Sequence, residues 1–161
     1  MSTRTITIAP VRKNIRVKAS QAQAFEVFTA GIDRWWPRTH SIGSAPVKSA
    51  VMEARLGGRW YQLCEDGSEA TVGKILAWEP PHRFVVSWDI NSQWKADLTV
   101  SSEVEVRFLA DGPDATLVEL EHRKFEQMGE EAGEKMRRDV DGGWPRMLEH
   151  FRNEAEASVS R

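Results

Sequence analysis

The chain has 161 residues, a length typical of one domain, and its 40% hydrophobic and 29% charged residues are ordinary for a globular protein. Its 24 acidic and 22 basic residues give a net charge of −2, which argues against nucleic acid as a partner because such binding needs a basic surface. The single cysteine excludes an intramolecular disulfide. No apolar run resembles a signal peptide or a membrane span, so we expect one cytoplasmic domain over residues 1–161.

The first part of the chain predicts a strand followed by two short helices. Ile6 and Ile8 alternate with threonine, and Ile15 and Val17 alternate with basic residues, as in half-buried strands. Ser20, followed three residues later by glutamine, is a capping box that predicts a helix start. Aromatic and aliphatic residues then follow at helical spacing: Phe25, Phe28, Ile32 and Trp35. Gly31 is expected to end the first helix, and Trp36-Pro37 the second.

From Pro46 to Arg123 the hydrophobic period changes to two, which predicts a series of strands. Turn sequences such as Gly57-Gly58 and Asp66-Gly67 separate them. The candidate strands are 47–56, 59–65, 69–78, 83–90, 98–109 and 115–123. The last two have one apolar and one polar face, which is typical of a curved antiparallel sheet that is covered on one side.

A long amphipathic helix is predicted after an acidic connector near residues 126–134. Its apolar residues step by three or four: Met136, Val140, Trp144, Met147, Leu148, Phe151 and Ala155. Pro145 removes one helical hydrogen bond and Gly142-Gly143 weaken the same turn, but the apolar stripe keeps its phase. We therefore expect a kink or a short helical lead-in rather than a break. The predicted class is α+β, with this helix covering the sheet.

The order of these elements and several local motifs resemble the helix-grip fold of the START-like (SRPBCC) superfamily. The motifs are similar to the branch named after the activator of the heat-shock-protein-90 ATPase. They are Ala19-Ser20, Trp35-Trp36, Arg55-Leu56-Gly57-Gly58-Arg59-Trp60, Gly73-Lys74-Ile75, Trp78-Glu79-Pro80-Pro81-His82-Arg83-Phe84, Trp88 and Gly143-Trp144. The resemblance covers about residues 12–155, which is nearly the whole chain.

The resemblance implies a mostly apolar cavity between a curved antiparallel sheet and the long C-terminal helix that it wraps around. Many relatives bind lipids or other hydrophobic small molecules there, and some carry out cyclase or related chemistry. The branch name implies a chaperone partner, but the co-chaperone has an additional N-terminal chaperone-binding domain for which this chain has no room. We therefore do not carry chaperone activation over, although contact with a chaperone stays open, as does a homodimer.

No motif in the sequence is typical of a metal site, a phosphate-binding loop or a nucleophile elbow. The four histidines are far apart in sequence and lack metal-ligand spacing: His40, His82, His122 and His150. Cys64 is expected to be a small buried hydrophobic residue rather than a nucleophile. We expect no metal and no cofactor.

The candidate ligand-binding residues are mainly aromatic. Trp88 and Trp144 lie on predicted inner faces, and Trp35 lies where the resemblance implies a cavity entrance. Tryptophan suits a cavity wall because its indole N–H usually needs a partner when buried, although ordinary core packing is the alternative at each position. Trp94 is a candidate lid or interface anchor, whereas Trp36, Trp60 and Trp78 are expected to be structural. The candidates are Trp35, Trp88, Trp94, His122, Trp144, Met147 and Phe151.

His122 is the only catalytic candidate, because it continues the inward face of the last strand. The alternative is a histidine whose hydrogen bonds are satisfied at the strand end. Three functions follow, in order of preference. The first is binding of a hydrophobic small molecule between sheet and helix, without catalysis. The second is a cyclase or isomerase that uses His122 as acid or base, and the third is a protein-interaction module that uses exposed aromatics such as Trp94 or Trp36.

Overall fold

The computed structural model describes residues 7–159, which form seven strands, two α-helices and two short 3-10 helices. In chain order the elements are β1 (Val11–Val17), α1 (Gln21–Phe28), η1 (Ile32–Arg34), β2 (Val47–Met52), β3 (Arg59–Cys64), β4 (Glu69–Glu79), β5 (Arg83–Trp88), β6 (Ser102–Ala110), β7 (Thr116–Arg123), η2 (Phe125–Met128) and α2 (Glu130–Val159). The predicted α+β helix-grip architecture is confirmed.

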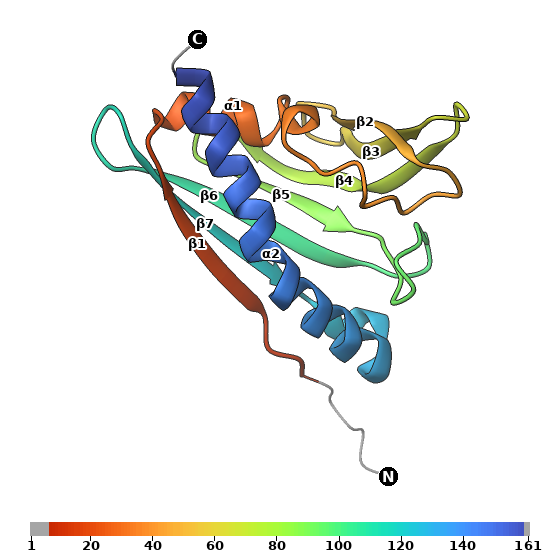
Figure 1. Ribbon diagram of the computed structural model, residues 1–161. Coiled ribbons are helices and arrows are strands. Elements are labelled where there is room, and N and C mark those ends of the chain that lie inside the picture. The colour runs from red at the N-terminus through yellow and green to blue at the C-terminus, as the bar shows by residue number, and fades with distance from the viewer. Residues whose placement is uncertain (1–6, 160–161) are drawn as a thin grey trace.

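All seven strands form one antiparallel sheet in the order β1-β7-β6-β5-β4-β3-β2. The register shifts between β3 and β4 at Trp60/Tyr61 and between β4 and β5 at Ile75/Ala77, and such bulges increase bending. The sheet curls into a half-barrel, and α2 lies diagonally across its concave side (Figure 1). The inner face is therefore the face that α2 covers.

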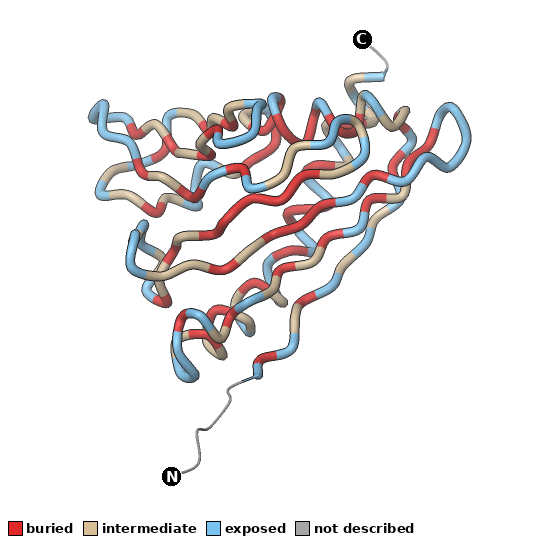
Figure 2. Tube along the Cα trace, turned by 180° about the vertical axis from the view of Figure 1, so that it is seen from behind, coloured by how far each residue is buried: buried red, intermediate tan, exposed pale blue. Residues whose placement is uncertain are grey.

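The alternation of residues along the strands decides which side chains face α2. In β7, Thr116, Val118, Leu120 and His122 are buried, as the sequence predicts. Figure 2 shows buried residues concentrated along the middle strands of the sheet. On the outer face, the buried carboxylate of Glu105 accepts hydrogen bonds from Arg83 and, at 2.6 Å, from Arg123. The polar face is thus held by ion pairs.

The first helix begins where the capping box predicts and ends earlier than expected. Ser20 is the N-cap, and its Oγ accepts a hydrogen bond from the backbone N–H of Gln23 at 3.3 Å. The helix ends at Phe28 and not at Gly31, because Thr29 caps it by donating from its hydroxyl to the Phe25 carbonyl at 2.7 Å. Gly31 instead precedes η1.

Three predicted strand boundaries differ from the structure, because local turns interrupt the apolar pattern. Strand β2 ends at Met52 rather than at residue 56, since residues 53–58 fold into a hydrogen-bonded turn. Strand β5 ends at Trp88 and β6 begins at Ser102, so residues 89–101 form a long loop instead of strand ends. Ile8 is buried but precedes β1, and Ile6 lies outside the described residues.

Helix α2 runs from Glu130 to Val159 and continues through Pro145, so the expectation of no true break is confirmed. Its buried stripe contains every residue that the periodicity predicts, together with Gly133. Helix α2 packs against η2 and β1, Asp139 in its N-terminal half binds Trp94 of the loop after β5, and its C-terminal half packs against α1. This arrangement places the middle of α2 opposite β3, β4 and β5.

Candidate functional site

A cavity of about 500 Å³ lies between the middle of α2 and the β3–β5 part of the sheet, and its lining is mostly apolar. This volume is within the usual range for small-molecule sites. Helix α2 contributes Asp139, Val140, Gly142, Gly143, Trp144, Arg146 and Met147. The sheet and the loop after β5 contribute Gln62, Val72, Trp88, Ile90 and Trp94, and the loop after η1 contributes Trp36, Thr39, His40, Ser41 and Ile42.

Five of the seven tryptophans lie around this cavity in mutual ring contact, and Trp35 touches the edge of this group through Trp36 at 5.6 Å. The centroid of Trp60 is 5.0 Å from that of Trp36 and 5.7 Å from that of Trp88. Trp88 is in turn 5.7 Å from Trp144 and 6.1 Å from Trp94. Trp60 lies behind the wall, whereas the other four line the cavity. Four tryptophans thus contribute to the cavity wall.

The indole N–H groups of this cluster differ in their hydrogen bonding. Trp144 donates to Nδ1 of His122 at 3.2 Å, and Trp94 donates to Oδ2 of Asp139 at 3.0 Å. The buried N–H groups of Trp36, Trp60 and Trp88 have no partner within residues 7–159. An unsatisfied buried donor costs about 1–3 kcal/mol. Trp36 and Trp88 are lining residues of the cavity, although their Nε1 atoms are themselves buried.

His122 lies behind the cavity wall and is fully buried. Burial lowers the pKa of His122 to about 3, so the ring is neutral at physiological pH. Its Nδ1 accepts from Trp144, so its proton is on Nε2, which lies 2.9 Å from the Ser102 hydroxyl. That hydroxyl in turn donates to the carbonyl of Trp88 at 3.4 Å. His122 thus positions two tryptophans of the wall and has no atom in the lining.

The other predicted site residues divide between the cavity and a neighbouring closed core. Trp88, Trp94, Trp144 and Met147 line the cavity. Trp35 and Phe151 do not: the Trp35 indole donates to the Val27 carbonyl at 2.8 Å, and its ring packs 5.6 Å from Phe151. Trp36, which the sequence assigned a structural role, lines the cavity instead, because consecutive residues after η1 point to different sides.

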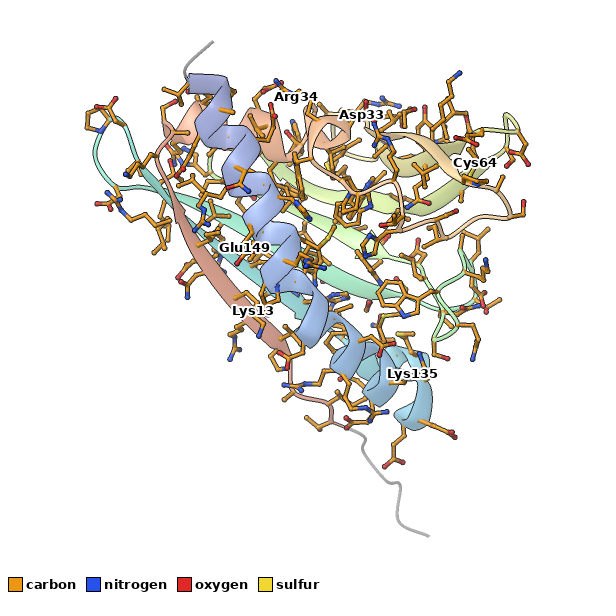
Figure 3. The ribbon with its side chains drawn as sticks, viewed as in Figure 1. Lys13, Asp33, Arg34, Cys64, Lys135 and Glu149 are labelled. Carbon is orange, nitrogen blue, oxygen red and sulfur yellow. The ribbon has the colours of Figure 1, made fainter. Side chains whose placement is uncertain are left out.

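Two polar clamps hold the loops that close the cavity. Gln62 is buried in β3, accepts from the Ile42 N–H at 2.9 Å and donates to the His40 carbonyl at 2.6 Å. On the other side, Lys135 reaches the Ser92 carbonyl at 2.6 Å and Asp139 at 2.8 Å, which ties the loop after β5 to α2 (Figure 3). Burial opposes ionisation of Asp139, but hydrogen bonds from Lys135 and Trp94 outweigh it and lower its pKa.

Sequence reasoning missed several lining residues, chiefly His40, Gln62, Gly142, Gly143 and Arg146. The glycine pair carried a usable signal, because two adjacent glycines inside a long helix are unfavourable without a local reason. His40 and Gln62 carried none, since a loop residue and a polar strand residue have no periodicity that points to a cavity. Within residues 7–159, no three side chains of the His, Cys, Asp and Glu types gather in a way that could hold a metal ion.

The curved sheet, the long C-terminal helix and the cavity between them define a START-like (SRPBCC) domain. Residues 18–156 match the family described as "Activator of Hsp90 ATPase homolog 1-like protein", and the chain belongs to this family. Among curated proteins, none matches the chain. The part of the chain that the structure describes has no helix with the length and hydrophobicity to span a membrane.

Solved structures of several proteins are similar to this chain. The anthrahydroquino-γ-pyrone synthase Txn09 is 37% identical, with 91% of this chain and 97% of that chain covered and a TM-score of 0.64. CalC from Micromonospora echinospora, a self-sacrificing resistance protein, is 32% identical, with 92% and 95% covered and a TM-score of 0.69. The Aha1 dimer from Colwellia psychrerythraea is 14% identical, with 92% and 97% covered and a TM-score of 0.63, and is similar in fold alone.

Proposed function

We propose that this protein binds a flat, hydrophobic small molecule in the cavity between the sheet and α2. The observation that carries the proposal is a mostly apolar cavity lined by four tryptophans, two of which have buried indole N–H groups without a partner. Apolar walls supply affinity at about 25 cal/mol per Å² removed from water. The free N–H groups of Trp36 and Trp88 supply orientation, because each favours an acceptor oxygen or nitrogen on the ligand.

The clamps around the cavity support tight binding, because they hold its walls in place before a ligand arrives. Gln62 fixes the loop after η1, and Lys135 with Asp139 fixes the loop after β5. Side chains that are already ordered lose little conformational freedom on binding, which reduces the ordering cost. A planar ligand is favoured over a flexible chain, since flat rings stack on indoles and lose less entropy.

Tryptophan fluorescence and native mass spectrometry test this function with two kinds of probe, anthraquinone and palmitate. We expect anthraquinone to quench the fluorescence and to form a one-to-one complex, with palmitate binding at least tenfold more weakly. Trp36→Phe and Trp88→Phe are expected to weaken anthraquinone binding about tenfold. Trp78→Phe is the matched control, since Trp78 is half-buried beside Phe25 and lies outside the cavity lining. Equal affinity in all three variants, or no quenching, contradicts the proposal.

A second candidate is an enzyme that acts on an aromatic substrate, and the identity of 37% to a protein described as a synthase favours it. Its acid or base would be His40 rather than His122, because His40 lines the cavity. Burial and the nearby charges of His150 and Arg146 lower the pKa of His40, which favours the neutral base. If the bound molecule is transformed, His40→Ala should abolish turnover and retain binding. Recovery of the ligand unchanged by mass spectrometry contradicts the enzyme.

The third function, a protein-interaction module with exposed aromatics, has less support. Trp36 is only 7% exposed and Trp94 is half-buried in the cavity wall, so neither presents a free aromatic surface. The homodimer, the chaperone contact and the cytoplasmic location stay predictions.

A further inference from the structure

Basic side chains gather at one part of the cavity wall. Arg146 on α2 and His40 on the loop after η1 both line the cavity, and His150 follows Arg146 by four residues, which is one helical turn. Arg146 is exposed and has no ion pair or hydrogen bond to any residue between 7 and 159. The other charged lining residue, Asp139, already binds Lys135 and Trp94. The cavity therefore presents an unpaired cation and no free carboxylate.

The charged side chains that act on His40 in this part of the wall are both basic. Burial and the charges of His150 and Arg146 all lower the pKa of His40, which favours its neutral form. Glu149, which neighbours His150 in sequence, lies on the side of α2 that is turned toward β1 (Figure 3). Arg146 therefore carries its charge beside a neutral His40, and an anion at this place forms charge-assisted hydrogen bonds with the guanidinium. This part of the wall is thus complementary to a negatively charged group.

The glycine pair beside Arg146 gives the wall a flat and open surface. A Cβ atom added to Gly142 or Gly143 would meet nothing within 4 Å, so close packing does not explain either glycine. Each glycine inside a helix is less favourable than alanine, and both line the cavity. Without side chains, the helix backbone is open to a ring system that approaches it from the cavity. Trp36 and Trp88 line the same cavity, and their buried N–H groups have no partner within residues 7–159.

We propose that the cavity selects flat aromatic acids. Their ring system lies on Gly142-Gly143 with an acceptor atom at the N–H of Trp36 or Trp88, and their anionic group binds the guanidinium of Arg146 beside His40. This inference rests on the proposed function and adds a charge and a shape to the ligand. Arginine is suited to this role because its planar fork binds a carboxylate through two parallel hydrogen bonds.

Two probes of nearly equal shape test the charge selection: anthraquinone-2-carboxylate and its neutral isostere anthraquinone-2-carboxamide. Fluorescence titration of the wild-type protein should give at least tenfold tighter binding of the carboxylate, with the advantage decreasing as salt is added. Arg146→Gln should remove most of this preference, because it should weaken binding of the carboxylate more than binding of the carboxamide. Arg138→Gln is the matched control, since Arg138 is an exposed residue of α2 outside the lining, and it should keep the preference.

The glycine surface is tested by Gly142→Ala and Gly143→Ala with the same two probes. Each variant should bind both probes at least fivefold more weakly while its thermal unfolding midpoint rises, so weaker binding cannot be attributed to misfolding. Unchanged affinity in both variants overturns the ring placement. Equal binding of the two probes to the wild-type protein overturns the charge selection and leaves the proposed function standing. Failure of both probes to bind overturns the proposed function as well.

Discussion

Two aromatic clusters lie beneath α2, and they differ in residue type and in closure. One consists of phenylalanines, Phe25, Phe28, Phe84, Phe108 and Phe151, each at most 5% exposed. Their rings pack closely, with centroids 4.8 Å apart for Phe28 and Phe151 and 5.1 Å apart for Phe25 and Phe108. The other consists of tryptophans, Trp36, Trp60, Trp88, Trp94 and Trp144, and it surrounds the cavity.

The difference follows from the indole N–H. A phenyl ring has no polar atom, so a closed cluster of phenylalanines leaves no donor unsatisfied. Trp35 packs against the phenylalanine cluster, and its N–H is satisfied by the backbone carbonyl of Val27. At the cavity, Trp36 and Trp88 keep free N–H groups. The phenylalanine cluster therefore contributes packing alone. The tryptophan cluster keeps N–H donors without partners, which is consistent with the proposed binding site.

The largest expected effect is loss of stability when the closed cluster is opened. Phe151→Ala should lower the free energy of unfolding by about 3–5 kcal/mol, because it leaves a cavity in a fully buried cluster. Met147→Ala, one turn earlier on α2, should cost less than half as much, because Met147 already faces a cavity. Urea denaturation of both variants measures the difference. Equal losses would contradict the contrast between a closed and an open cluster.

The next effect is acid sensitivity at the tryptophan cluster. Burial lowers the pKa of His122 from 6.5 to about 3, so the unfolded chain takes up a proton that the folded protein does not. His122 therefore does not reduce stability above pH 6.5. As the pH falls from 6.5 toward 3, its burial lowers the free energy of unfolding, by about 2 kcal/mol between pH 7 and pH 5. Urea denaturation at several pH values measures this slope.

A matched variant separates His122 from other titrating groups. His122→Gln retains an acceptor for Trp144 and a donor for Ser102, and it should remove most of the slope between pH 6.5 and pH 5. Burial opposes ionisation of Glu105, but hydrogen bonds from Arg83 and Arg123 lower its pKa from 4.5 to about 2. The stabilisation that ionised Glu105 provides is therefore lost only below pH 4.5, outside the range from pH 6.5 to pH 5. A slope that persists in His122→Gln would assign the acid sensitivity elsewhere.

The smallest effect separates satisfied from unsatisfied indoles within the tryptophan cluster. Trp144→Phe leaves Nδ1 of His122 without a donor and should cost about 1–2 kcal/mol more than Trp36→Phe, which removes a donor that has no partner. Thermal or urea unfolding without ligand measures both. If Trp36→Phe proves the more damaging change, its N–H is satisfied in the free protein and its proposed role in binding fails.

Much of the fold was predictable because its signals are local. The period of two places β3, β4 and β7 to within two residues, and the capping box at Ser20 locates the start of α1. The sequence predicts strand for parts of the loop of residues 89–101, because Ile90 and Val100 continue an apolar pattern. Side-chain bonds such as that from Ser101 to Asp89, at 2.7 Å, and from Asn91 to Asp97, at 3.3 Å, hold this segment as a loop.

The site was predictable only in part. The inward stripe of α2 correctly places Trp144 and Met147 on the side that lines the cavity, since helical periodicity determines a face. The roles of Trp35 and Trp36 depend on the backbone at the end of η1, where no periodicity applies. His122 is inward-facing as predicted, yet a second layer of indoles separates it from the cavity. A side chain that faces inward from the sheet therefore does not necessarily line the cavity.

By itself, the sequence determined the order of the elements, the face that each strand and α2 bury, and an excess of tryptophan that needed a cause. These are properties of neighbouring residues, so periodicity and capping encode them. Only the tertiary structure decided which indoles keep a free N–H and that Arg146 and His40 line the same cavity, with the charge of Arg146 acting on His40. The physical reason is that hydrogen-bond satisfaction and charge pairing depend on distances between segments that are remote in the chain, and those distances exist only after the sheet has closed around α2.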